Sequence, residues 1–269
     1  MLRERVTSAL MLGALAFAAV GAGQVTAAAF IVCFIAICLV EYAVLLRSLG
    51  TDTVVMLVWG LALSVQHLLP ATFPDAQVFS GLLVVSVVWT VWRFEHGCDK
   101  AFAGFSLMLI GALLIGWMGG HFLLLRLLPQ GFFWMVTVVL AVAFADSAAY
   151  FIGRKLGKHP MAARTSPHKT WEGYSAGIAA ASLGTAAAAA LWQLTGTTVP
   201  HAACHALIIG FLVAAIAPIS DLFFSVVKRS VGAKHASNLI PGHGGLLDRF
   251  DTLLLASAIG YYYVTLVVL

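Results

Sequence analysis

Long apolar runs alternate with short polar segments along the whole chain. About nine runs approach the roughly 20 residues that a helix needs to cross the hydrocarbon core of a bilayer. They cover about residues 6–22, 25–44, 53–70, 77–93, 101–120, 131–150, 174–194, 204–225 and 253–269. Their Ala, Leu, Gly and Phe content favours helices over membrane β-strands, which would alternate with a period of two. The pattern therefore predicts an all-α, polytopic integral membrane protein with about nine transmembrane helices.

Composition supports the same class. Hydrophobic residues make up 61% of the 269 positions and charged residues 10%, whereas soluble domains contain about 25% charged residues. The mean hydropathy is +0.98. The first run follows Arg3 and Arg5 and leads to the sequence VTAAA, which resembles a signal peptide. Because the apolar stretch continues directly into a second run, we expect a retained first helix.

Positive charge predicts the orientation. All but one of the 15 Lys and Arg residues fall in segments 1–5, 45–52, 93–100, 151–172 and 228–251, and the exception is Arg126. Cytoplasmic loops are enriched in Lys and Arg, so we expect an inner-membrane protein of a bacterium with its N-terminus inside and its C-terminus outside. These cations face anionic headgroups or phosphates. The net charge of +4 therefore does not call for a nucleic-acid partner.

The two halves of the chain differ in polarity. Residues 1–130 are apolar runs joined by short loops with few titratable groups. Residues 131–269 contain two longer polar segments, 151–172 and 228–251. The apolar runs that precede these segments contain carboxylates near their ends. We interpret the first half as N-terminal transmembrane helices and the second as a catalytic transmembrane region with both polar segments in the cytoplasm.

Two carboxylates lie inside predicted spans. Asp146 is in AVAFADSAAYFIG and Asp221 is in AAIAPISDLFFSVVKR, each within a helical turn or two of the cytoplasmic end. A carboxylate at this depth is costly and usually faces a polar cavity or a partner. The alternative for each is an acid that only caps a helix at the interface. Since each run leads into a basic segment, we favour a polar cavity.

The basic segment 151–172 interleaves cations with small and hydroxyl residues. The cations are Arg154, Lys155, Lys158, Arg164 and Lys169, and the residues between them include Gly153, Gly157, Ser166 and Thr170. Cationic side chains beside exposed backbone donors suit a phosphate-rich ligand, although no GxxxxGK[ST] sequence is present. A basic loop can equally reflect only the positive-inside rule. The residues alone leave both interpretations open.

The segment KRSVGAKHASNLIPGHGGLLDRFD, residues 228–251, is more specific. Its glycines allow sharp turns and a close approach of the backbone to a ligand. Asp248 and Asp251 are three positions apart and would share one face of a helix. Together with Asp221 of the preceding span they would supply hard oxygen ligands, which Mg²⁺ prefers.

Acids flanked by Lys228, Arg229 and Lys234 are what metal-dependent phosphoryl or nucleotidyl transfer needs, because the metal and the cations neutralise and orient phosphates. A solvated surface turn is the alternative. Exposed ion pairs contribute only about 0–1 kcal/mol, which is too little to explain carboxylates placed at the membrane edge.

These residues resemble the C-terminal signature of the phosphatidate cytidylyltransferases (CDP-diacylglycerol synthases). The signature reads S-x-x-K-R, four residues, K-D, and then P-G-H-G-G-x-x-D-R-x-D. The matching residues are Ser225, Lys228, Arg229, Lys234, Pro241, Gly242, His243, Gly244, Gly245, Asp248, Arg249 and Asp251. The sequences DSAAYFIGRKLGKH and SPHKTWEG are also similar to the family. The specific motifs cover about residues 146–251, whereas the first half is similar only in being several membrane helices.

The resemblance implies the reaction of CTP with phosphatidate to give CDP-diacylglycerol and pyrophosphate. It implies Mg²⁺ at Asp221, Asp248 and Asp251, and two divalent ions are compatible with it. The implied catalytic residues are Asp221, Asp248, Asp251, Lys228 and Arg229. The implied substrate-binding residues are Asp146, Ser166, Lys169, Thr170, Glu172, Lys234, His243, Gly244, Gly245 and Arg249. The resemblance also implies that the protein lies in a lipid bilayer. A homodimer is compatible with the resemblance.

One position departs from the family pattern. Where the family has Lys-Asp, this chain has Lys234-His235. Imidazole does not supply the hard anionic oxygen of a carboxylate and favours softer metals than Mg²⁺. Either this position is not a metal ligand, or this chain binds metal or nucleotide poorly, or the residue is an engineered change. The sequence leaves these alternatives open.

Two other functions compete with the cytidylyltransferase. A CTP-dependent kinase of polyprenol or dolichol would share a CTP site and transfer the γ-phosphate instead. An ion-coupled transporter would carry charges at the membrane midplane and broken helices related by a repeat. The acids of this chain gather at one predicted interface and no repeat is evident, which favours an enzyme.

Overall fold

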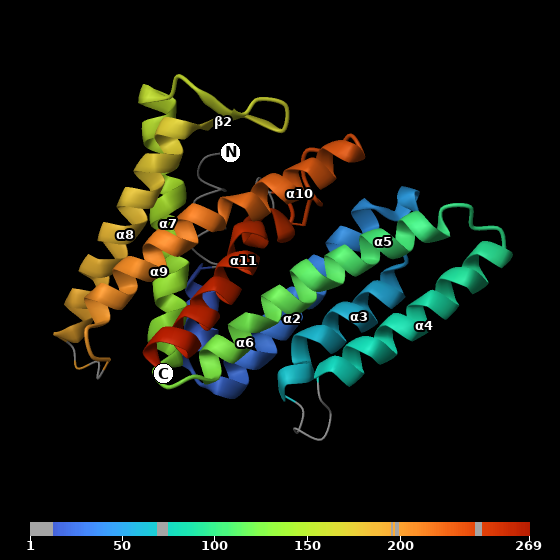
Figure 1. Ribbon diagram of the computed structural model, residues 1–269, viewed down its shortest axis with the longest axis horizontal. Coiled ribbons are helices and arrows are strands. Elements are labelled where there is room, and N and C mark those ends of the chain that lie inside the picture. Colours follow the sequence, from blue (N-terminus) through green and yellow to red (C-terminus); the bar gives the residue numbers. More distant parts are fainter. Residues whose placement is uncertain (1–12, 69–74, 195, 197–198, 240–243) are drawn as a thin grey trace. The chain divides into compact units, whose positions relative to one another are not determined.

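The computed structural model describes residues 13–68, 75–194, 196, 199–239 and 244–269 (Figure 1). Residues 13–21 are helical. They are followed by α2 (Gln24–Leu45), η1 (Arg47–Leu49), α3 (Thr53–Val65), η2 (Gln66–Leu68), α4 (Asp75–Glu95), α5 (Ala101–Gly111), η3 (Ala112–Met118) and α6 (Gly119–Leu127). The second half contains α7 (Gly131–Leu156), β1 (Pro160–Ala162), β2 (Ser166–Thr170), α8 (Trp171–Gln193), α9 (Ala202–Ile216), α10 (Pro218–Ser230), α11 (Leu247–Tyr263) and η4 (Val264–Val268).

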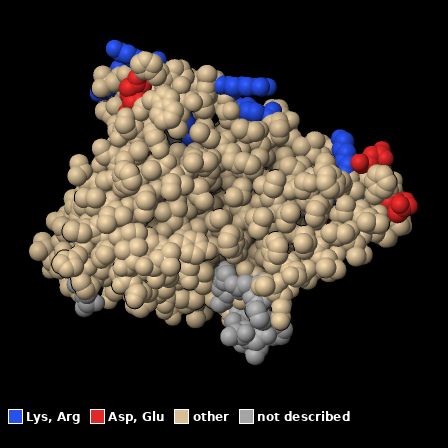
Figure 2. Space-filling view, viewed as in Figure 1, with Lys and Arg blue, Asp and Glu red and all other residues tan. Residues whose placement is uncertain are grey.

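Seven helical segments among the described residues are long and apolar enough to cross a membrane. They are Gln24–Leu45, Ala76–Glu95, Ala101–Leu127, Gly131–Leu156, Trp171–Gln193, Ala202–Ser230 and Leu247–Val268, and α3 is a shorter apolar helix. Figure 2 shows Lys, Arg, Asp and Glu side chains in a few groups at the edge of one face, while other residues cover most of that face. The prediction of an all-α, polytopic integral membrane protein is confirmed. The predicted span 6–22 lies partly outside the described residues.

The chain forms two compact units. The first comprises Met1–Leu124 and Val231–Phe250, and the second comprises Leu125–Ser230 and Asp251–Leu269. Helix α11 begins in the first unit and continues in the second. The functional division near residue 130 was inferred from the positions of polar segments, and it stays a prediction.

Helices of the first unit approach one another closely through small residues. Helix α3 packs against α2 and η3. A side chain on Gly120 would meet the backbone oxygen of Ser64 at 2.9 Å, so that position accepts only glycine without a shift of α3. Trp59, Leu63 and Ala112 form a buried cluster nearby. Small residues at helix contacts are typical of membrane proteins, where close backbone packing replaces the hydrophobic effect.

Two cations join neighbouring loops at one end of the first unit. The Arg93 guanidinium donates to the Gly50 carbonyl at 2.6 Å, and the Lys100 ammonium donates to the Ser48 carbonyl at 2.8 Å. The segments 45–52 and 93–100, which the charge pattern assigns to one side of the membrane, therefore lie together.

In the second unit, α8 packs between α7 and α9. A side chain on Gly177 of α8 would meet the Ala145 carbonyl oxygen of α7 at 3.0 Å. The Tyr174 hydroxyl donates to the Ala215 carbonyl of α9 at 2.6 Å. Hydrogen bonds of this kind contribute about 1 kcal/mol or less in membrane proteins, so the three helices are held mainly by close packing.

The predicted span 204–225 is a helix with a break. Helix α9 ends at Ile216 and α10 begins at Pro218. Proline lacks the N–H that would continue the helical ladder, and it is favoured at the first position of a new helix. Pro218 therefore accounts for the boundary between α9 and α10, and α10 carries Asp221 in its first turn.

Helices extend further into both polar segments than predicted. Helix α7 continues to Leu156, and α8 begins at Trp171 because the Thr170 hydroxyl caps it by accepting the Gly173 N–H at 3.2 Å. Between them, β1 and β2 form an antiparallel hairpin in which Pro160 is opposite Thr170. The segment 228–251 is likewise shortened, because α10 runs to Ser230 and α11 begins at Leu247.

Candidate active site

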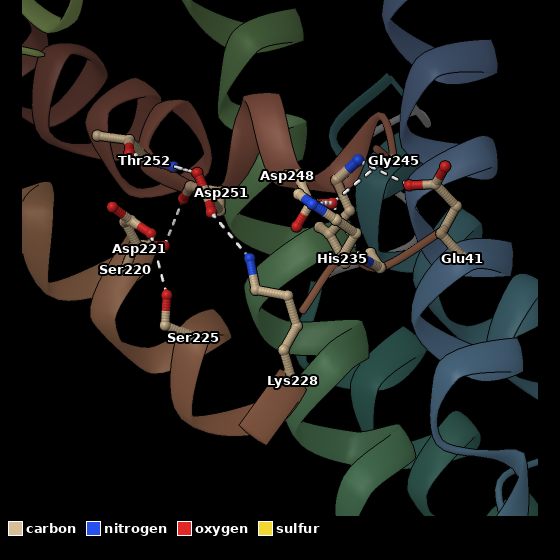
Figure 3. A network of polar contacts seen from close by, with 12 residues as sticks. Glu41, Ser220, Asp221, Ser225, Lys228, His235, Gly245, Asp248, Asp251 and Thr252 are labelled. Atoms are coloured by element: carbon tan, nitrogen blue, oxygen red, sulfur yellow. Dashed lines mark hydrogen bonds and ion pairs between the residues drawn. The ribbon is translucent and has the colours of Figure 1, made fainter. Parts of the chain in front are cut away.

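Asp221 lies in the first turn of α10, in the second unit. Its Oδ2 is 2.5 Å from the Nζ atom of Lys169 on strand β2, and its Oδ1 accepts a hydrogen bond from Ser225 at 3.3 Å (Figure 3). The Asp221 side chain is 31% exposed and that of Lys169 is 28% exposed. The hairpin thus brings a cation onto a carboxylate that solvent can still reach.

Asp251 of α11 is another acid of this unit, and its side chain is only 7% exposed. Its Oδ2 is 3.9 Å from the Nζ atom of Lys228 on α10, and its Oδ1 accepts the Thr252 N–H at 2.8 Å. The Ser220 hydroxyl donates to the Asp251 carbonyl at 2.5 Å (Figure 3). Helices α10 and α11 are therefore joined beside two acids and a lysine.

Asp248 lies on the part of α11 that belongs to the first unit. Its Oδ2 accepts the N–H groups of Ala236 at 2.9 Å and Gly245 at 3.0 Å. His235, at the departing family position, has its Nδ1 at 3.6 Å from the same oxygen (Figure 3). Gly244 has φ +83° and leaves no room for a side chain between these groups. Asp248 therefore holds Gly244 and Gly245, the described part of the glycine-rich turn, against the start of α11.

Glu41 is a carboxylate that the sequence analysis missed. It lies near the end of α2, is 6% exposed, and accepts hydrogen bonds from the Ser237 hydroxyl and the N–H groups of Leu246 and Leu247. In Figure 3 the Glu41 side chain points toward Gly245. A single acid in the otherwise uncharged sequence CFIAICLVEYAVLL was the available signal, because such acids seldom lack a partner or a function.

The hairpin residues are held at the start of α8. The Glu172 carboxylate lies 2.6 Å from the Nδ1 atom of His159 and accepts the His159 backbone N–H at 3.3 Å. Thr170 caps the helix. Ser166 and Lys169 lie on the same strand, β2, so the structure brings these predicted residues together at one end of the second unit.

The remaining predicted residues have simpler positions. Asp146 lies on α7, Arg229 on α10 and Arg249 on α11, and all three are exposed. Lys234 is exposed in the segment between α10 and α11. His243 lies outside the described residues.

The acids of the second unit fit a divalent cation chemically. Asp221 and Asp251 offer carboxylate oxygens, and each already faces an ammonium group, of Lys169 and Lys228 respectively. Within the described part of the chain, no three His, Cys, Asp or Glu side chains form a metal-binding group. Mg²⁺ commonly needs only one or two carboxylates, with water and substrate phosphates as its other ligands. The predicted set of Asp221, Asp248 and Asp251 includes residues of both units and stays a prediction.

The long apolar helices and the acid–lysine pairs at their ends define the class of protein. It is a polytopic helical membrane protein with charged side chains that can bind a metal or phosphate. Residues 3–267 match the model of the cytidylyltransferase family. The chain belongs to this family.

Relatives agree with the family model. The chain is 38% identical over 178 residues to a phosphatidate cytidylyltransferase of Brucella suis, a match that covers 65% of this chain and 59% of that protein. It is 33% identical over 158 residues to the Bacillus subtilis protein of the same name, covering 58% and 57%. The Pseudomonas aeruginosa protein of that name is 32% identical over 203 residues, covering 72% and 73%. The matches thus span between about half and three quarters of these relatives.

Proposed function

We propose that this protein is a phosphatidate cytidylyltransferase. A phosphate oxygen of phosphatidate bonds to the α-phosphorus of CTP, and the bond from that phosphorus to the oxygen that bridges it to the β-phosphate breaks. The products are CDP-diacylglycerol and pyrophosphate. The names of the relatives and the family membership support this reaction. The lipid phosphate is already ionised near neutral pH, so the reaction needs little help from a general base.

The acid–lysine pairs of the second unit carry the proposal. Asp221 with Lys169, and Asp251 with Lys228, put carboxylates and cations side by side at the ends of α10, α11 and β2. A triphosphate and a phosphate monoester are both anionic, so their reaction needs positive charge that screens their repulsion. Carboxylates in the same place serve to hold the metal that supplies part of this charge.

A bound Mg²⁺ supplies charge neutralisation at the reacting phosphates. Asp221 and Asp251 of the second unit would hold it. Lys228 and Arg229 on α10 would bind and orient phosphates of CTP and of the lipid. Other substrate contacts come from Asp146, Ser166, Lys169, Thr170, Glu172, Lys234, His243, Gly244, Gly245 and Arg249.

The surroundings follow from the same charges. We place the protein in the inner membrane of a bacterium with its basic segments on the cytoplasmic side, where CTP is found, and with its C-terminus outside. Phosphatidate reaches the helix ends laterally from the bilayer. A homodimer is compatible with this arrangement.

The test uses CTP labelled at either the α- or the γ-phosphorus, with phosphatidate and Mg²⁺ in detergent micelles. We expect the α-label to enter the lipid fraction as CDP-diacylglycerol and the γ-label to leave as pyrophosphate. Entry of the γ-label into added polyprenol would identify a kinase instead. Ion flux into liposomes without nucleotide, together with no lipid labelling, would identify a transporter.

A His235→Asp protein, run beside the wild type, tests the departing position. Equal activity would show that position 235 is not needed for metal binding. Activity only in the His235→Asp protein would confirm the reaction of the family and show that this chain is a disabled copy. Product from neither folded protein would contradict the proposed function.

A further inference from the structure

Two carboxylates fix the segment that leads into α11. The first N–H groups of a helix have no partner within the helix. Here the Glu41 Oε1 accepts the Leu246 N–H at 3.0 Å, and its Oε2 accepts the Leu247 N–H at 2.7 Å. Asp248 from the helix itself binds the N–H groups of Ala236 and Gly245. The entry into α11 is therefore capped twice, once from its own chain and once from α2.

Glu41 also holds the chain that precedes the glycine-rich turn. The Ser237 hydroxyl donates to Glu41 Oε1 at 2.6 Å and accepts the Leu239 N–H at 3.1 Å. All of these groups belong to the first unit. A single buried acid on α2 thus binds Ser237 as well as Leu246 and Leu247.

The backbone of Gly245 is closely packed against Glu41 and Ser237. A side chain on Gly245 would lie 2.7 Å from Glu41 Oε2 and 3.0 Å from the Ser237 nitrogen. The carboxylate therefore lies directly against the backbone of the turn. A group in this position controls where Asp248 and Arg249 stand, although it contacts neither of them in these hydrogen bonds.

We infer that Glu41 is a positioning residue for cytidylyl transfer: its carboxylate sets the place of Gly245, Leu246 and the first turn of α11. The inference rests on the proposed function. Because Glu41 acts through backbone groups of the turn, its loss lowers the turnover number of the folded enzyme. A purely structural cap would lower the stability alone.

The test replaces Glu41 by Gln, which has nearly the same volume. One amide oxygen still accepts from Ser237 and Leu246, but the amide nitrogen is a donor and faces the Leu247 N–H. We expect kcat for CDP-diacylglycerol formation to fall about 10- to 100-fold, as for other groups that orient catalytic residues. Hydrogen exchange of the Leu246 and Leu247 amides in the intact protein should become faster.

Asp52→Ala is the matched control in the same unit, because it removes a helix cap. The Asp52 carboxylate caps α3 by accepting the N–H groups of Val54 at 2.9 Å and Val55 at 3.0 Å. This variant should exchange faster at Val54 and Val55 and keep the wild-type kcat. Ser237→Ala removes one of the three bonds to Glu41 and gives a milder fall in kcat, so the inference can be tested even if Glu41→Gln does not fold.

The outcomes are distinct. Wild-type kcat in Glu41→Gln or, where that variant does not fold, in Ser237→Ala overturns the inference. So does an equal loss of kcat in Glu41→Gln and Asp52→Ala, because both then report general destabilisation. Unchanged exchange at Leu246 and Leu247 also overturns it. Failure of the proposed function looks different: the wild-type protein then forms no CDP-diacylglycerol, whatever residue 41 is.

Discussion

Glu41 and Asp248 of the first unit differ in their partners from Asp221 and Asp251 of the second unit, although Asp251 also accepts the Thr252 N–H. In the first unit, Glu41 and Asp248 accept hydrogen bonds from backbone N–H groups at 2.7 to 3.0 Å. In the second unit, Asp221 and Asp251 face the ammonium groups of lysines at 2.5 and 3.9 Å. Backbone donors are fixed by the fold, whereas an ammonium on a flexible four-carbon stem can move away.

This difference separates two roles for the same functional group. An acid bound by backbone amides determines where the chain runs, and its replacement changes the positions of other residues. An acid that faces lysines can exchange them for a metal or release them to a phosphate. We therefore expect substitutions of Asp221 and Lys169 to act on chemistry and substrate binding, and substitutions at Glu41 and Gly245 to act through the shape of the turn.

The largest effect is expected for Asp221→Asn. Asparagine keeps the shape but removes the negative charge that faces Lys169, so kcat should fall by more than about 100-fold. The unfolding temperature should change little, because the side chain is 31% exposed. CDP-diacylglycerol formation and thermal unfolding in detergent measure the two quantities. Asp99→Asn, on the exposed loop before α5, is the control, and near-normal turnover of Asp221→Asn would contradict the comparison.

Gly245→Ala tests the close contact between Glu41 and the backbone of the turn. The added methyl group would meet Glu41 Oε2 at 2.7 Å, so the turn must shift. We expect a loss of about 1–3 kcal/mol in unfolding free energy and about a tenfold fall in activity.

Gly81→Ala is the control for this change, since nothing lies within 4 Å of a side chain there. Alanine should stabilise α4 by about 0.5–1 kcal/mol. If both glycine variants have the same stability and activity, the close contact at Gly245 does not contribute to either.

Lys169→Met should act mainly on nucleotide binding. It removes the ammonium beside Asp221 but keeps a long apolar stem, so KM for CTP should rise about tenfold, which corresponds to one charge-assisted hydrogen bond. Lys100→Met is the matched control, because that ammonium binds the Ser48 carbonyl of the first unit. An unchanged KM in Lys169→Met would mean that the hairpin lysine does not contact the nucleotide.

The smallest effect is expected for Thr170→Ala. The change removes the N-cap of α8 and should lower the unfolding free energy by about 1 kcal/mol, measured by thermal unfolding. Thr170→Ser keeps a hydroxyl at the cap and should retain most of the stability. Equal losses in both variants would show that the methyl group of Thr170, rather than its hydroxyl, stabilises the start of α8.

Much of the fold could be predicted because membrane helices reveal themselves locally. The predicted run 25–44 corresponds to α2 at Gln24–Leu45, and 101–120 lies within Ala101–Leu127. The break at Pro218 had a local signal, but apolar length alone conceals it. The β-hairpin had no such signal, since a basic loop of two three- to five-residue strands has no hydrophobic face to repeat.

The candidate site was only partly visible in the sequence. Helical spacing correctly predicts that Asp248 and Asp251 share helix α11. Sequence cannot show that Lys169 reaches Asp221, because that contact depends on how the hairpin lies beside α10. Glu41 was missed for the same reason: its partner Ser237 is 196 residues away in the chain, and no local pattern connects them.

The clamp at Glu41 has a consequence for biosynthesis. Its acceptor oxygens enter the membrane with α2, while Leu246 is made 205 residues later. At about 5–20 residues per second, a ribosome needs on the order of 10–40 s for that stretch. During this time the nascent first unit contains an acid whose backbone donors do not yet exist. The unit can therefore be completed only after the ribosome has passed Phe250, the last residue of the first unit.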